Sequence, residues 1–174
     1  MGSTSYAELL FSFKGRIQRL YFWIPSLVVG VIVGILTTSL QFWAQQVGSG
    51  AIDPETQQFE PSGSFAIGIG IIAILNMWIN FALCTKRLHD RDRTGWWLVV
   101  QFLTLIVAVI ILVGAFLVPE DQRMPWFVVA GVAGAISFVV SIWLFIEIGF
   151  LRGTQGPNRF GADPLGATQP DAKL

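Results

Sequence analysis

Residues 96–118 read WWLVVQFLTLIVAVIILVGAFLV and contain no charged side chain. A helix needs roughly 20 consecutive apolar residues to cross a bilayer core about 30 Å thick, and this stretch is long enough. Inside hydrocarbon the backbone must satisfy its own hydrogen bonds, and a long apolar run without period-2 alternation favours a helix over a barrel strand. The stretch therefore predicts a transmembrane helix.

Three further apolar blocks have a similar length and lie at about residues 21–43, 65–83 and 126–150. The 174-residue chain is 53% hydrophobic and only 13% charged, whereas about 25% of residues are charged in a typical soluble domain. We therefore expect an all-α polytopic membrane protein with four transmembrane helices. Its membrane domain should cover residues 1–165, and residues 166–174 should form a flexible tail.

The basic residues predict how the chain is oriented. Ten of the eleven Lys and Arg residues fall on one side of the four spans, and only Arg123 lies in a loop of opposite parity. Positive charge near the ends of spans is retained in the cytoplasm, so both termini and the 85–95 loop should be cytoplasmic. The ten residues are Lys14, Arg16, Arg19, Lys86, Arg87, Arg91, Arg93, Arg152, Arg159 and Lys173.

The N-terminal twenty residues have an apolar pattern of their own, in which Tyr6, Leu9, Leu10, Phe13, Ile17 and Leu20 recur at helical spacing. This pattern is typical of an amphipathic helix that lies in the membrane interface. Gly15 should weaken or kink such a helix. The alternative is a partly frayed segment that leads into the first span.

The most distinctive segment is the loop between the second and third spans, KRLHDRDRTGWW at residues 86–97. Its four basic residues, less Asp90 and Asp92, leave a charge of +2 with His89 neutral. Each Lys or Arg beside an anionic leaflet gains about 1 kcal/mol, which favours a loop that orients the chain and contacts lipid headgroups. The alternative is a ligand or partner site in which guanidinium groups grip carboxylate or phosphate.

Three motifs resemble those of the DUF805 family of small bacterial inner-membrane proteins. Residues 13–23, FKGRIQRLYFW, resemble the opening signature of the family. Residues 87–90, RLHD, followed by RTGWW at 93–97, resemble its central RLHD…RSGWW pattern. Residues 156–164, GPNRFGADP, resemble its terminal GxNRYGPxP pattern.

Three departures from the family pattern are small: Asp92 stands where Gly is usual, Thr94 replaces Ser and Phe160 replaces Tyr. The resemblance covers roughly residues 9–165. It implies a multi-pass protein of the bacterial inner (plasma) membrane, of uncharacterised function, and it supplies no catalytic residues.

All three motifs map to the same side of the predicted membrane, so they could meet as one cytoplasmic cap. A loop that only stops translocation needs charge, but it does not need His, Asn, Gly and tandem Trp at fixed positions. We therefore predict a hydrogen-bonded cluster, with a structural role first and ligand binding second. Its candidate residues are Arg16, Arg19, Arg87, His89, Asp90, Arg93, Trp96, Asn158 and Arg159.

A few polar residues interrupt the apolar blocks. Glu147 is the only carboxylate within one, and ionisable residues inside membranes are costly and are functional candidates by default. It should pair with Lys86, Arg87 or Arg152 as a structural anchor, or it should handle protons or ions. Asn76 and Asn80 lie one turn apart on one helix face. They should bond neighbouring helices or, with Gln101 and Ser141, line a polar path.

The leading interpretation is a non-enzymatic integral membrane protein whose basic cap binds anionic lipid headgroups or a membrane-protein partner. The alternative is a small transporter or channel subunit that uses Glu147 with the Asn76 and Asn80 face and forms a homo-oligomer. The sequence lacks a nucleophile triad, a phosphate-binding Gly-rich loop and a zinc signature. We therefore expect no enzymatic activity, no cofactor and no metal, and we expect no nucleic-acid partner.

Overall fold

The computed structural model describes residues 5–47, 50–52, 55, 59–61 and 63–166 of the chain. The chain divides into two compact units. The first unit contains Phe13–Phe22 and the chain from Cys84 onward, and the second contains the residues up to Ser12 together with Trp23–Leu83. Residues 167–174, which hold most of the expected flexible tail, lie outside the described residues.

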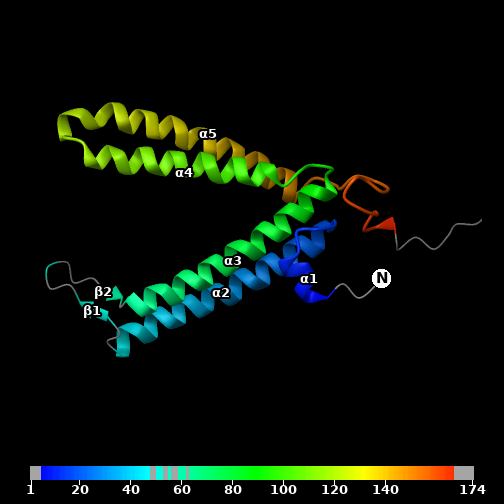
Figure 1. Cartoon of the computed structure of the whole chain (residues 1–174), viewed down its shortest axis with the longest axis horizontal. Coiled ribbons are helices and arrows are strands. Elements are labelled where there is room, and N and C mark those ends of the chain that lie inside the picture. The colour runs from blue at the N-terminus through cyan, green and yellow to red at the C-terminus, as the bar shows by residue number, and fades with distance from the viewer. Residues whose placement is uncertain (1–4, 48–49, 53–54, 56–58, 62, 167–174) are drawn as a thin grey trace, which may run out of the picture. The chain divides into compact units, whose positions relative to one another are not determined.

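Long helices dominate the described part of the structure (Figure 1). They are α2 (Arg19–Val47), α3 (Gly63–Asp90), α4 (Trp96–Leu117) and α5 (Arg123–Gly149). All four are long and apolar enough to cross a membrane, which confirms the prediction of four spanning helices. Each is longer than the roughly 20 residues that a bilayer requires.

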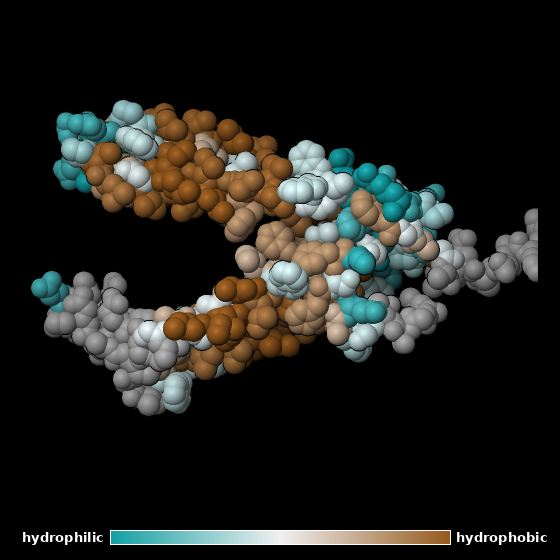
Figure 2. Space-filling model, viewed as in Figure 1, coloured by the Kyte–Doolittle hydropathy of each residue, from teal (hydrophilic) through white to brown (hydrophobic). Residues whose placement is uncertain are grey.

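The surface of these helices is apolar. On α2 the side chains of Leu27, Val31 and Ile35 are 60%, 58% and 63% exposed. Figure 2 shows hydrophobic surface along the long helices and hydrophilic surface gathered near their ends. Soluble proteins rarely expose apolar patches of more than a few hundred Å², so these faces fit a lipid environment.

Short elements lie outside the four long helices. Strands β1 (Gly50–Ile52) and β2 (Phe59–Pro61) form an antiparallel pair in the connection between α2 and α3, with Ala51 opposite Glu60. The 3-10 helix η1 (Glu120–Gln122) connects α4 to α5. The sequence predicted no strand, and this small hairpin does not change the all-α architecture.

Helix α1 (Tyr6–Phe11) covers only the first part of the predicted N-terminal amphipathic helix. Ser5 starts it, because the Ser5 hydroxyl accepts a hydrogen bond from Ala7 N at 3.3 Å. The helix ends at Phe11, where Ser12 takes an extended backbone with φ −85° and ψ 141°. Further on, Gly15 has a φ of 90°, which lies in the left-handed region that glycine adopts readily. The segment that contains Gly15 is therefore free to contribute main-chain groups elsewhere in the first unit.

The prediction that a loop begins at residue 85 is wrong, because α3 continues to Asp90. The helix ends in a Schellman motif, in which Arg93 N donates to Leu88 O at 2.9 Å and Asp92 N donates to His89 O at 3.0 Å. Asp92 takes the left-handed position of this motif, with a φ of 57°. Glycine is preferred there, which explains why Gly is usual at this position in the family pattern that the central motif resembles.

Helices α4 and α5 pack against each other in the first unit. Ala108 and Ala115 on α4 and Ala130 on α5 are buried, and small residues of this kind let helix backbones approach closely in membranes. Gln101 Nε2 donates to Ser137 Oγ at 3.1 Å across the pair. The sequence named Gln101 with Ser141 as lining of an alternative polar path, and in the structure the hydroxyl that Gln101 contacts is that of Ser137.

Candidate functional site: a buried arginine–carboxylate cap

The three motifs meet in the first unit as one cluster, here called the polar cap, formed by residues 13–22, 84–95 and 147–166. These segments hold nine basic side chains and four carboxylates, a net charge of +5 with His89 neutral. The basic residues are Lys14, Arg16, Arg19, Lys86, Arg87, Arg91, Arg93, Arg152 and Arg159, and the acidic residues are Asp90, Asp92, Glu147 and Asp163.

The carboxylate of Asp90 lies at the centre of the polar cap. Arg87, one turn earlier on α3, donates to its Oδ2 atom. Arg16 donates to its Oδ1 atom from Nε at 3.2 Å and from Nη2 at 3.1 Å. All three side chains are at least 95% buried. Charges this deep are tolerated only when they are paired and hydrogen-bonded, so the three form one unit.

Arg16 also holds the C-terminal segment. Its Nη1 donates to Gly156 O at 2.8 Å and to Gly161 O at 3.2 Å. Its Nη2 donates to Thr154 O at 2.7 Å and to Thr154 Oγ1 at 3.2 Å. The planar guanidinium presents five donors in a fixed fork, which a lysine ammonium cannot reproduce. Arg16 therefore ties the first motif to the second and the third.

Three guanidinium groups cover the C-terminal end of α5. The last carbonyl groups of a helix have no partner within it, and the helix dipole places negative charge there. Cationic donors satisfy both requirements. The contacts are Arg87 Nε to Ile148 O at 2.9 Å, Arg87 Nη2 to Leu151 O, Arg19 Nη1 to Phe150 O at 3.1 Å, and Arg91 Nη1 to Arg152 O.

Glu147 belongs to the polar cap. Its Oε1 accepts hydrogen bonds from Arg91 Nε at 3.2 Å and from Arg93 Nε at 2.7 Å, and the residue is only 4% exposed. The predicted partners were Lys86, Arg87 or Arg152, and that prediction is wrong. The chain turns sharply after α3, so the arginines just beyond the turn reach Glu147, while Arg87 pairs with Asp90.

The terminal motif is joined to the central one through Asn158. Its Nδ2 donates to His89 O at 2.9 Å and to Thr154 Oγ1 at 3.0 Å, and its Oδ1 accepts from Phe160 N at 2.9 Å. The Phe160 ring stacks on His89 with centroids 3.9 Å apart. His89 Nδ1 in turn donates to Gly15 O at 3.2 Å. Family motifs at three places in the chain are thus linked by hydrogen bonds.

Eight of the nine candidate residues of the polar cap contact one another or nearby segments among the described residues, and the ninth, Trp96, does not. Trp96 is 71% exposed at the start of α4. Arg159 forms an exposed ion pair with Asp92 at 3.1 Å. Asn76 and Asn80 lie in the second unit, where Asn80 Nδ2 donates to Asn76 Oδ1 at 3.0 Å.

Two residues that the sequence did not single out support the centre of the polar cap. Thr154 donates to Asp90 O from its main-chain N at 2.8 Å and from Oγ1 at 3.1 Å. A Cβ atom on Gly153 would lie 2.0 Å from Asp90 Oδ2, so only glycine fits. Their position just before the terminal motif is the one signal that could have suggested them.

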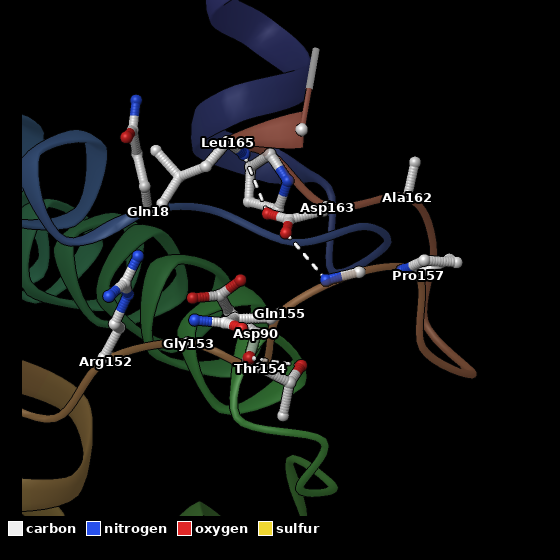
Figure 3. Close-up of a pocket in the computed structure, with 13 residues that line it drawn as sticks. Gln18, Asp90, Arg152, Gly153, Thr154, Gln155, Pro157, Ala162, Asp163 and Leu165 are labelled. Atoms are coloured by element: carbon white, nitrogen blue, oxygen red, sulfur yellow. Dashed lines mark hydrogen bonds between the residues drawn. The ribbon is translucent and has the colours of Figure 1, made fainter. Parts of the chain in front are cut away.

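A pocket of about 670 Å³ opens within the polar cap (Figure 3). Gln18, Asp90 and residues 152–157 and 162–166 line it. Asp163 shapes one wall, because its carboxylate accepts hydrogen bonds from Leu165 N at 2.9 Å and from Gly156 N at 2.8 Å. These main-chain donors lower the pKa of Asp163 below its ordinary value, so this carboxylate stays charged at neutral pH.

Comparisons with known proteins agree with the motif resemblance. The family model described as "Protein of unknown function (DUF805)" matches residues 10–162. The chain is 30% identical over 156 residues to "Uncharacterized protein YiiR" of Escherichia coli strain K12, a match that covers 90% of this chain and 88% of the relative. The same values hold for the protein of that name in Escherichia coli O157:H7. No solved structure matches the chain.

Proposed function

The chain belongs to the DUF805 family, and from this premise we propose that it is a non-enzymatic protein of the bacterial inner membrane whose polar cap binds anionic lipid headgroups. The four apolar helices support a multi-pass membrane protein. The excess of basic residues on one side supports a cytoplasmic position for the polar cap.

The charge of the polar cap is the observation that carries this proposal. Its nine basic residues exceed its four carboxylates by five, and the buried ion pairs account for only part of the positive charge. Among the described residues, the exposed side chains of Arg19 and Arg152 form no ion pair with a carboxylate. Arg19 donates only to the Phe150 carbonyl, which leaves its charge in place.

The location of these two arginines suits a lipid surface. Arg19 is the first residue of α2, and Arg152 follows the end of α5 by three residues. Basic residues just beyond spanning helices gain about 1 kcal/mol each beside an anionic leaflet. The tandem Trp96 and Trp97, both exposed at the start of α4, match the aromatic residues found at membrane–water interfaces.

Lipid binding is better supported than the transporter alternative. That alternative relied on Glu147 as an ion-handling group, yet two arginines hold its carboxylate. An ion path through Glu147 would have to break both pairs. Asn76 and Asn80, the other pathway candidates, bond each other.

The proposal can be tested by native mass spectrometry of the purified protein with equal amounts of phosphatidylglycerol and phosphatidylcholine. We expect retention of phosphatidylglycerol, and a drop of about fivefold for Arg19→Gln and for Arg152→Gln, which corresponds to about 1 kcal/mol each. Arg123→Gln is the matched control, because Arg123 pairs with Glu120 beside η1 and lies outside the polar cap.

The control should retain as much phosphatidylglycerol as the unmodified protein. Equal retention of the two lipids by the unmodified protein would contradict the proposal. Retention of a second protein in place of lipid would favour a partner-binding role.

A further inference from the structure

We propose that the pocket in the polar cap binds a phosphate ester that carries free hydroxyl groups, the chemistry of a glycerol-phosphate headgroup. This inference rests on the proposed function and names the site and the ligand class within it. The pocket lies entirely in the first unit, so residues of that unit alone define it.

The size of the pocket suits a small organic ligand. Its volume of about 670 Å³ falls within the roughly 300–1,000 Å³ of typical small-molecule sites. An inorganic ion alone would leave most of this space to water. A glycerol-phosphate group fits inside and leaves room for the rest of a lipid to extend outward.

One cation in the pocket wall is available to a ligand. The Arg152 side chain forms no hydrogen bond or ion pair among the described residues, and Figure 3 shows it on the same side of the pocket as Gln18. A guanidinium matches the geometry of a phosphate group and binds it through two parallel hydrogen bonds. Asp90 in the same wall does not repel the phosphate strongly, because Arg16 and Arg87 neutralise it.

The remaining polar groups favour hydroxyls beside the phosphate. The side-chain amides of Gln18 and Gln155 form no hydrogen bond within the described part of the chain, and an amide both donates and accepts hydrogen bonds. Asp163 faces them across the pocket (Figure 3). Its carboxylate already accepts two main-chain hydrogen bonds and has further lone pairs that can accept from a hydroxyl.

The same carboxylate argues against a highly charged ligand. One unpaired arginine and one charged Asp163 give the wall little net charge, which suits a phosphate ester with one or two negative charges better than a polyphosphate. The pocket also lies next to helix ends, since its wall includes the last residue of α3 and the residue before α2 begins. A lipid headgroup lies at the height of the ends of membrane-spanning helices, so it could reach the pocket. A soluble glycerol phosphate offers the same chemistry.

The test uses the full-length protein in detergent with two probes, phosphatidylglycerol and glycerol 3-phosphate. Ala162→Phe fills the pocket without changing any charge, because Ala162 lines the wall and is exposed. Ala7→Phe is its control, since Ala7 is exposed on α1 outside the pocket. Arg19→Gln changes the charge of the polar cap but not the pocket wall.

We expect Ala162→Phe and Arg152→Gln each to lower the affinity for glycerol 3-phosphate, measured by calorimetry, at least tenfold, and to lower phosphatidylglycerol retention. Ala7→Phe should keep both. Thermal unfolding of each variant checks that the fold survives, and Ala162→Gly, which leaves the pocket open, should bind as the unmodified protein does.

The outcomes separate the pocket from the proposed function. If Arg19→Gln weakens phosphatidylglycerol retention while Ala162→Phe changes neither probe, the pocket inference is wrong and the proposed function stands. If glycerol 3-phosphate binds in an Ala162-dependent way but no lipid is retained, the pocket is supported with a soluble ligand and the lipid function fails. If neither probe binds the unmodified protein, both proposals fail.

Discussion

The guanidinium of Arg16 donates two hydrogen bonds to one carboxylate oxygen of Asp90, 74 residues later in the chain. The other oxygen of Asp90 accepts from Arg87. One buried carboxylate therefore holds two buried cations, and through Arg16 it also holds the segment from Thr154 to Gly161. The stability of the polar cap should depend on this relationship more than on any other polar contact.

Replacing Asp90 tests that dependence. Asp90→Asn should lower the free energy of unfolding by about 3–5 kcal/mol, because it leaves two buried guanidinium groups without their counter-charge. Asp92→Asn is the control, since the Asp92–Arg159 pair is largely exposed and is worth about 0.2–1 kcal/mol. Thermal and denaturant unfolding in detergent would measure both. Equal effects of the two substitutions would show that Asp90 is not the centre of the polar cap.

A methyl group at position 153 should disturb the same centre sterically. In Gly153→Ala the new Cβ would meet Asp90 Oδ2 at 2.0 Å and Asp90 Cγ at 2.6 Å, so the segment or the carboxylate must move. We expect a loss of about 3 kcal/mol, the upper end for overpacking, in the same unfolding measurement.

Gly131→Ala is the matched control for that substitution. Gly131 lies within α5 and has nothing within 4 Å of an added Cβ. Alanine there should be neutral or stabilise the helix by up to about 1 kcal/mol. A larger loss at position 131 than at position 153 would contradict the packing described at Asp90.

Asp92 occupies a left-handed backbone position, and substitutions there should separate backbone strain from ion pairing. Asp92→Gly relieves strain of about 1 kcal/mol but loses the exposed pair with Arg159, so stability should stay within about 1 kcal/mol. Asp92→Ala loses the pair and keeps the strain. It should be about 1–2 kcal/mol less stable than Asp92→Gly, and equal stability of the two variants would exclude a strained position.

The folding of residues 153–166 should depend on pH through Asp163. Main-chain hydrogen bonds from Leu165 and Gly156 lower the pKa of Asp163 in the folded protein. A lowered folded pKa means that the stabilisation is present above the unfolded pKa of about 3.9 and is lost as the pH falls through the folded value. Hydrogen exchange of this segment should therefore become less protected in acid, relative to a reference peptide.

Asp163→Asn removes the titrating group and is the control for that measurement. In this variant, residues 153–166 should be less protected from hydrogen exchange at neutral pH than in the unmodified protein, and their protection should change little in acid. A segment that stays fully protected below the pKa of Asp163, in the unmodified protein, would exclude this role for the carboxylate.

The orientation in the membrane is open to direct labelling. In a Cys84→Ser background, a single cysteine at Glu55 should react in intact cells with a thiol reagent that does not cross the inner membrane. A cysteine at Pro157, which is exposed in the polar cap, should react only after the cells are opened. The reverse pattern would overturn the cytoplasmic assignment of the polar cap.

The four spanning helices were predictable because each is encoded by one continuous apolar run, and a membrane leaves the backbone few alternatives to a helix. The three motifs also indicated that their residues gather together. The partners of Glu147 were not predictable from the sequence, since they depend on where the turn after Asp90 directs Arg91 and Arg93. The fold of residues 153–166 depends likewise on hydrogen bonds from Arg16, about 140 residues away in the chain.

By itself, the sequence determined the number of apolar helices and the segments in which basic residues gather, because both properties depend on neighbouring residues along the chain. Only the tertiary structure decided which charges are buried and which remain exposed. Arg16, Arg19, Arg87 and Arg159 all lie in the three motifs, and the sequence does not distinguish them. In the structure only Arg16 and Arg87 form ion pairs with Asp90. The physical reason is that burial of a charge depends on a partner brought close in space, and here that partner comes from a distant segment.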